Sequence, residues 1–129
     1  MNSENRMKKI LIVEDNKHLQ FTLSTLMEES GYKPYVSGNK KKAITDFNLK
    51  KPDLILLDKK LPDGDGMDLI IKFKGVNQKL PIIMLTAYGE TKIKDQAISL
   101  GANAFITKPF DITELITTIE NLLKAYNNN

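Results

Sequence analysis

Short, continuous apolar runs alternate along this chain with longer segments of helical spacing, and this alternation constrains the fold more than any other feature. Residues 10–13, 54–57, 82–85 and 104–106 form four such runs, and residues 35–36 form a weaker fifth. Runs that are apolar at every position are typical of strands buried on both faces, as in parallel sheets. The runs therefore predict five strands of a parallel sheet.

The segments between the runs carry apolar residues at the spacing of amphipathic helices. The stripe is clearest over residues 112–123, and Met67, Ile70 and Ile71 form a shorter one. Strand–helix units repeated five times predict an α/β fold, a doubly wound sheet with five helices on its two faces. Pro34 lies at the start of the second run, and proline lacks a backbone N–H, so the second strand is expected at a sheet edge.

Length and composition bound the class of protein. With 129 residues, the chain is predicted to be a single domain, residues 1–129. It has no cysteine, which excludes disulfides and thiolate metal sites. The net charge is +3, but the lysines are spread along the chain, so direct nucleic-acid binding is not expected. Neither a secretory signal nor a membrane-spanning run is visible, and we expect a cytoplasmic protein that does not bind membranes.

Polar residues of complementary chemistry follow the strongest apolar runs. Glu14 and Asp15 follow the first strand, Asp58 the third, Thr86 the fourth and Lys108 the fifth. Ligands of open parallel sheets bind beyond the carboxyl ends of the strands, so these side chains are expected at one edge. An Asp or Thr after a strand is often only a helix cap. Four strand ends with complementary chemistry instead favour a functional site.

The chemistry of this set indicates its ligands. Carboxylates held close together repel one another unless a cation neutralises them. Oxygen ligands without His or Cys favour a hard ion such as Mg²⁺. An ammonium and a hydroxyl suit an oxyanion, for which phosphate is the natural candidate.

Several motifs occur in a fixed order along the chain. They are Ile-Leu-Ile-Val-Glu14-Asp15-Asn, Pro52-Asp-Leu-Ile-Leu-Leu-Asp58, Leu61-Pro62-Asp-Gly-Asp65-Gly66, Leu-Thr86-Ala87 and Phe105-Ile-Thr-Lys108-Pro109-Phe110. With these motifs the chain resembles the receiver domains of two-component response regulators, over about residues 8–124. The resemblance implies a flavodoxin-like receiver fold with strand order 2-1-3-4-5.

The resemblance also implies a role for each acidic residue. Asp58 would be the nucleophile that takes a phosphoryl group. Asp15 would bind Mg²⁺ or Mn²⁺ directly, and Glu14 mainly through water. Asp58 and the backbone carbonyl of Lys60 would complete the protein ligands of the metal.

The remaining roles implied by the resemblance concern catalysis and switching. Lys108 would pair with one phosphoryl oxygen, and Thr86 would donate a hydrogen bond to another. Thr86 would move toward the phosphoryl group, and Phe105 would fill the space left behind, so the two residues would form the switch. The Lys108–Pro109 peptide bond is expected to be cis.

Two large side chains near the site bear on the lifetime of the phosphoryl group. Lys60 lies two residues after Asp58, and Tyr88 lies two residues after Thr86. Both can cover the phosphoryl group and keep water away from it. We therefore expect slow hydrolysis.

The resemblance implies a signalling switch that catalyses only its own phosphorylation and dephosphorylation. Its donor would be a sensor histidine kinase or a phosphotransfer protein, and its target a downstream protein or a fused output domain. The motifs fit a stand-alone regulator and a part of a longer one equally well. The alternative within the family is a degenerate receiver that acts as a phosphorylation-independent docking module.

Two other classes share parts of this pattern. A flavodoxin-like nucleotide binder needs a phosphate loop after the first strand, but residues 14–17 are Glu-Asp-Asn-Lys, whose two acids would repel a phosphate without metal. A phosphatase of the dehalogenase type needs an Asp two residues after its nucleophile, and Lys60 stands there. Neither class fits as well as a receiver domain.

Overall fold

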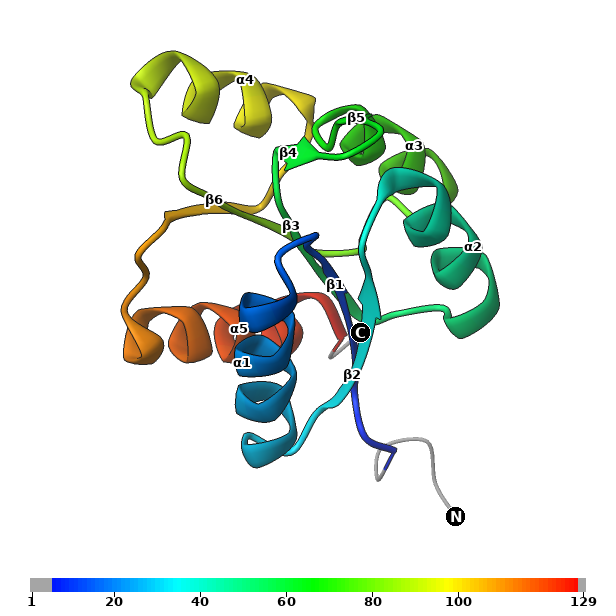
Figure 1. Ribbon diagram of the computed structural model, residues 1–129. Coiled ribbons are helices and arrows are strands. Elements are labelled where there is room, and N and C mark those ends of the chain that lie inside the picture. Colours follow the sequence, from blue (N-terminus) through cyan, green and yellow to red (C-terminus); the bar gives the residue numbers. More distant parts are fainter. Residues whose placement is uncertain (1–5, 128–129) are drawn as a thin grey trace.

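The computed structural model describes residues 6–127 as a parallel sheet with helices on both faces (Figure 1). The parallel strands are β1 (Lys9–Val13), β2 (Lys33–Ser37), β3 (Leu54–Leu57), β6 (Ile82–Thr86) and β7 (Ala104–Thr107). The helices are α1 (Lys17–Glu29), α2 (Lys40–Lys50), α3 (Asp68–Val76), α4 (Thr91–Leu100) and α5 (Ile112–Asn127). A small antiparallel hairpin is formed by β4 (Lys60–Leu61) and β5 (Gly64–Asp65). Residues 1–5 and 128–129 of the predicted domain lie outside the described residues.

The strand order of the large sheet is β2-β1-β3-β6-β7. This is the predicted order 2-1-3-4-5, because β6 and β7 are the fourth and fifth strands of that sheet. β2 is an edge strand, as Pro34 predicted, and Pro34 lies opposite Ile10 of β1. The order reverses between β1 and β3, and such a reversal is where open α/β sheets bind their ligands.

Two apolar cores lie on the two faces of the sheet. Leu11 of β1 packs with residues of α2, α3 and α4. Ile10 of the same strand packs with residues of α1 and α5 on the other face. Successive side chains of a strand point to opposite faces, so a strand covered on both sides is apolar at every position. This explains the continuous runs of the sequence.

The predicted apolar stripe of α3 is wrong at one position. Ile71 is 60% exposed, whereas Leu69, Ile70 and Phe73 are buried. Residues three and four apart share a helix face, and Phe73 follows Ile70 by three and Leu69 by four. Ile71 therefore points away from the core. No helix between residues 6 and 127 is both long and apolar enough to cross a membrane.

Candidate functional site

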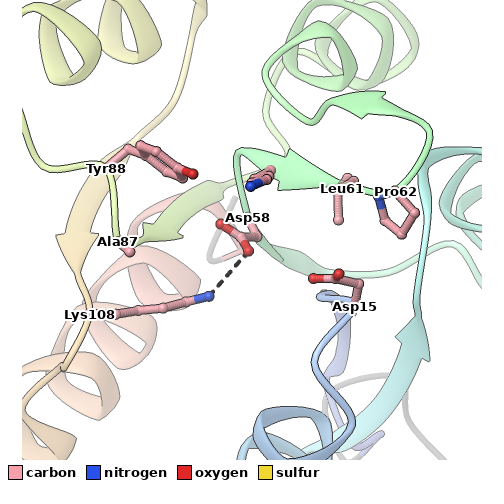
Figure 2. Close-up of a pocket in the computed structure, with 8 residues that line it drawn as sticks. Asp15, Asp58, Leu61, Pro62, Ala87, Tyr88 and Lys108 are labelled. Carbon is pink, nitrogen blue, oxygen red and sulfur yellow. Dashed lines mark hydrogen bonds and ion pairs between the residues drawn. The ribbon is translucent and has the colours of Figure 1, made fainter.

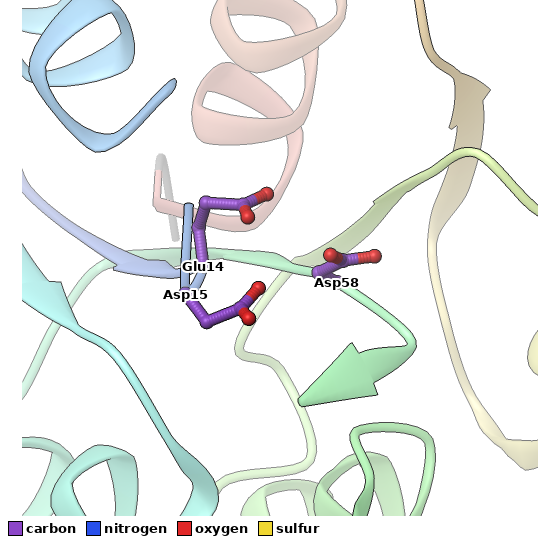
Figure 3. A group of neighbouring side chains, drawn as sticks. All are labelled: Glu14, Asp15 and Asp58. Atoms are coloured by element: carbon purple, nitrogen blue, oxygen red, sulfur yellow. The ribbon is translucent and has the colours of Figure 1, made fainter. Parts of the chain in front are cut away.

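Three carboxylates meet at the carboxyl edge of the sheet, where the strand order reverses (Figure 3). Glu14 and Asp15 follow β1, and Asp58 follows β3. The backbone N–H of Asp58 donates to the carbonyl of Val13 at 3.0 Å, which holds the two strand ends together. One carboxylate oxygen from each of the three acids lies within 4.8 Å of the other two. The structure thus brings together the three acids that the sequence predicted.

The three carboxylates differ in their surroundings. Glu14 is buried, and its two oxygens accept hydrogen bonds from the backbone N–H of Asn16 at 2.9 Å and from Lys108 at 2.6 Å. Asp58 is also buried, whereas Asp15 is exposed. Within residues 6–127, Asp15 forms no ion pair. The carboxylate of Asp15 is therefore accessible to a ligand, and its direct contact to a metal stays a prediction.

Lys108 is the cation that holds this acidic group in place. It follows β7, and its backbone N–H donates to the carbonyl of Thr86 at 2.9 Å. Its Nζ lies 2.6 Å from Glu14 Oε1 and 3.2 Å from Asp58 Oδ2, and Figure 2 shows the bond to Asp58. Burial alone would lower the pKa of Lys108, but its hydrogen bond to Glu14 and the charges of Asp58 and Glu14 outweigh burial and raise the pKa. The Lys108–Pro109 peptide bond is cis, as predicted.

The charges of the site do not balance. Three carboxylates and one ammonium leave two negative charges at the carboxyl edge. A divalent cation matches this excess, and carboxylate oxygens are the ligands that Mg²⁺ and Mn²⁺ prefer. The donor set therefore fits such an ion, which Asp15 and Asp58 would hold directly. Both oxygens of Glu14 already accept hydrogen bonds, which fits its predicted contact to the metal mainly through water.

A cavity of about 420 Å³ opens above these residues. Its lining residues are Asp15, Asp58, Lys60, Leu61, Pro62, Ala87, Tyr88 and Lys108. Figure 2 shows Asp58 in the middle, with Lys108 on one side and Asp15 on another. Lys60 belongs to the hairpin that follows Asp58 and lines the cavity. Its carbonyl as a metal ligand stays a prediction.

Thr86 and Phe105 lie on neighbouring strands near the site. Thr86 ends β6, is fully buried, and accepts a hydrogen bond from the backbone N–H of Tyr88 at 3.3 Å. Phe105 of β7 lies opposite Met84, two residues before Thr86. Phe105 and Thr86 therefore belong to the same face of the sheet. Phe105 is half-buried against the core beneath α2, α3 and α4. Their roles as a switch stay predictions.

Lys59 and Gly66 lie in the segment that follows Asp58. The structure gives each of them a role that sequence reasoning did not assign. A Cβ at Gly66 would overlap the carbonyl oxygen of Asp58, so only glycine fits there. The Nζ of Lys59 lies 2.9 Å from Asp65 and 5.8 Å from the ring centroid of Tyr88. Lys59 thus connects the hairpin to the loop after β6. Gly66 stands in a recognised motif, but nothing in the sequence distinguishes Lys59 from the other lysines.

Comparison with known proteins decides the family. The family model described as the response regulator receiver domain matches residues 10–120. The chain belongs to this family. This receiver domain is 32% identical to the sporulation initiation phosphotransferase F of Bacillus subtilis, over 94% of this chain and 98% of that protein.

Other relatives of this receiver domain are longer. It is 34% identical to the phosphate regulon transcriptional regulatory protein PhoB of Escherichia coli, over 91% of this chain and 52% of that protein. The receiver domain therefore spans about half the length of this relative. A solved CheY-like receiver domain of Methanospirillum hungatei superposes with a TM-score of 0.90 at 26% identity, over 95% of this chain and 98% of that one.

Proposed function

We propose that this receiver domain accepts a phosphoryl group on Asp58 and passes the signal on through a change of its partner-binding surface. The observation that carries the proposal is the position of Asp58. It is buried beside Lys108, in one acidic group with Asp15 and Glu14, at the floor of an open cavity. Membership of the receiver family supports the same function.

The reaction needs positioning and charge neutralisation more than covalent chemistry from the protein. A carboxylate oxygen of Asp58 attacks the phosphorus of a phosphohistidine. The new O–P bond forms as the N–P bond breaks, and the electron pair of that bond stays on the imidazole. No general base is needed, because an ionised carboxylate has no proton to lose. Mg²⁺ or Mn²⁺, when bound, supplies positive charge that neutralises the phosphoryl oxygens.

Lys108 and Thr86 have complementary tasks in this reaction. The ammonium of Lys108 already lies 3.2 Å from Asp58, within reach of a phosphoryl oxygen attached there. The hydroxyl of Thr86 can donate to a second phosphoryl oxygen. That donation would draw Thr86 toward Asp58 and open space for Phe105 on the same sheet face. An aspartyl phosphate would thereby shift the population toward a second state of the surface near β6 and β7.

Membership of the receiver family supports the proposed partners. The donor is a sensor histidine kinase or a phosphotransfer protein, and the target is a downstream protein or a fused output domain. We propose that the domain works in the cytoplasm, that it binds neither nucleic acid nor membranes itself, and that it catalyses only its own phosphorylation and dephosphorylation. The alternative function is a docking module that is never phosphorylated.

Tyr88 is proposed to protect the aspartyl phosphate from water together with Lys60. Both residues line the cavity above Asp58. Tyr88→Ala should therefore speed the loss of the phosphoryl group several-fold, measured by intact mass after removal of the donor. Tyr126→Ala is the matched control, because Tyr126 is an equally exposed tyrosine on α5. Equal rates of loss in the Tyr88 variant and the wild type would contradict this shielding.

The proposed function is tested by intact mass after incubation with acetyl phosphate and Mg²⁺. One added phosphoryl group is expected on the wild type and on Asp95→Ala, which removes an exposed acid of α4 outside the site. No added group is expected on Asp58→Ala or when Mg²⁺ is chelated. A folded wild type that binds Mg²⁺ and still gains no phosphoryl group would favour the docking module.

A further inference from the structure

The tip of the β4–β5 hairpin is attached to a helix that comes much earlier in the chain. Asp63 lies between β4 and β5. Its Oδ1 accepts a hydrogen bond from the backbone N–H of Lys40 at 2.8 Å, and its Oδ2 accepts one from Lys41 at 3.0 Å. These are the first two residues of α2, and the first N–H groups of a helix have no partner within the helix. The carboxylate of Asp63 satisfies two of them.

α2 already has a cap of its own. The side chain of Asn39 accepts a hydrogen bond from the backbone N–H of Lys42 at 2.8 Å. Asp63 therefore does more than begin the helix, because it connects the helix to a separate segment. The two caps use different N–H groups, so either can be removed while the other stays in place.

A second contact connects α2 to α3 beside the hairpin. The Nζ of Lys40 lies 3.0 Å from Asp68 at the start of α3. On its way it passes Gly64 so closely that a Cβ there would stand 3.1 Å from Nζ. Lys40 thus lies against the hairpin between α2 and α3.

The base of the hairpin is attached to the phosphoacceptor itself. The backbone N–H of Gly66 donates to the carbonyl of Lys59 at 2.6 Å, and Gly66 packs against the carbonyl of Asp58. The loop that leaves Asp58 thus returns to it. Lys60 lies between this base and the tip held by Asp63, and it lines the cavity of the site.

We propose that Asp63 is a positioning residue, which locks the hairpin to α2 and thereby sets the place of the Lys60 carbonyl at the metal site. This inference rests on the proposed function for the part that concerns the metal. It makes the amino end of α2 part of the support of the site, although no residue of α2 lines the cavity. Loss of the contact between Asp63 and this end of α2 should therefore alter the affinity for Mg²⁺.

Two measurements on the full chain test this inference. The first is amide hydrogen exchange without metal, at Lys40, Lys41 and the hairpin. The second is titration with Mg²⁺ alone, read by calorimetry. Asp63→Ala should speed exchange at both places and weaken Mg²⁺ binding by about tenfold, as the loss of a supporting contact does at other metal sites.

Two control variants separate positioning from simpler effects. Asn39→Ala removes the other cap of α2 and should lower the melting temperature about as much as Asp63→Ala does. Its affinity for Mg²⁺ should stay near that of the wild type. Asp68→Asn removes a nearby negative charge that accepts no backbone hydrogen bond from α2, and it should weaken Mg²⁺ binding less than Asp63→Ala. Asp63→Asn keeps one carbonyl acceptor and should restore part of the affinity.

The outcomes are distinct. Unchanged hairpin exchange in Asp63→Ala would overturn the inference, and so would equal losses of Mg²⁺ affinity in Asp63→Ala and Asn39→Ala. A wild type that binds no Mg²⁺ would contradict the proposed function and the metal part of this inference. In that case faster exchange in Asp63→Ala would still show that Asp63 holds the hairpin.

Discussion

The two edges of the parallel sheet both hold carboxylates but balance them differently. At the amino edge, Asp53 precedes β3 and accepts two hydrogen bonds from the guanidinium of Arg6, at 3.1 and 3.0 Å. A third comes from the backbone N–H of Lys9 at 2.8 Å. At the carboxyl edge, three carboxylates share the single ammonium of Lys108. At the amino edge, one guanidinium neutralises one carboxylate, and a backbone N–H adds a further hydrogen bond. At the carboxyl edge, one ammonium leaves two of the three negative charges unneutralised.

This difference separates charges that stabilise the fold from charges that serve a ligand. A half-buried carboxylate with several donors lowers the free energy of the folded chain. Carboxylates that crowd one another raise it unless a cation arrives. The carboxyl edge is therefore less stable without a bound cation. Removal of Asp53 at the amino edge should destabilise the fold, whereas removal of the exposed acid Asp15 at the carboxyl edge should stabilise it.

The largest effect is expected from the loss of the shared cation. Lys108→Met leaves two buried carboxylates unpaired, so the free energy of unfolding without Mg²⁺ should fall by about 3 kcal/mol. The rate of phosphorylation by acetyl phosphate should fall by about 100-fold. Chemical denaturation and intact mass measure the two changes. Lys59→Met is the control, because its ion pair with Asp65 is partly exposed and should contribute less than about 1 kcal/mol.

A smaller loss is expected at the amino edge. Asp53→Ala removes the acceptor of Arg6 and Lys9 and should cost about 2 kcal/mol of unfolding free energy. The loss should be the same with and without Mg²⁺, because Asp53 is remote from the metal site. Asp68→Ala, which breaks an exposed ion pair with Lys40, should cost less than about 1 kcal/mol. If the loss of unfolding free energy in Asp53→Ala depended on Mg²⁺, the amino edge would be coupled to the metal site, which would contradict the difference between the two edges.

A gain of stability, in place of a loss, is expected when the exposed acid of the site is removed. Asp15→Asn removes one of the crowded negative charges and should raise the free energy of unfolding by about 1 kcal/mol in EDTA. Saturating Mg²⁺ should stabilise the wild type more than the variant, so the difference should shrink or reverse. Denaturation curves in EDTA and in Mg²⁺ measure both. A variant that is less stable than the wild type in EDTA would show that repulsion from the neighbouring carboxylates does not destabilise the fold at Asp15.

A loss of about the same size, and one that depends on pH, is expected at Asp46, a carboxylate near the carboxyl edge whose hydrogen bonds are satisfied. It accepts hydrogen bonds from Ser37 and Lys42, both at 2.7 Å. Burial would raise the pKa of Asp46, but these hydrogen bonds and the nearby lysine charges outweigh burial and lower the pKa below its ordinary value of 3.8.

The sign of the pH dependence follows from that lowered pKa. A carboxylate whose pKa is lower in the folded state stabilises the fold above its ordinary pKa, and the contribution is lost as pH falls through the folded value. Asp46→Asn should therefore cost about 1 kcal/mol at pH 7 and progressively less below pH 4. Denaturation at several pH values checks this, and a cost that grows toward low pH would contradict it.

Much of this fold follows from local sequence signals. The apolar runs at residues 10–13 and 54–57 are strands because both faces of the sheet are covered, and the acids that follow them must then lie at one edge. The hairpin was not predicted, because β4 and β5 have two residues each and no apolar run. The contacts of Asp63 and Asp53 join segments far apart in the sequence, so only the packed chain reveals them.

The unbalanced negative charge at the carboxyl edge is expected to bind a divalent cation. Calorimetric titration of the wild type and Asp15→Asn with Mg²⁺ tests it most directly. We expect saturable binding of one ion to the wild type and binding at least about tenfold weaker to the variant. Equal affinities, or no binding to the wild type, would contradict it.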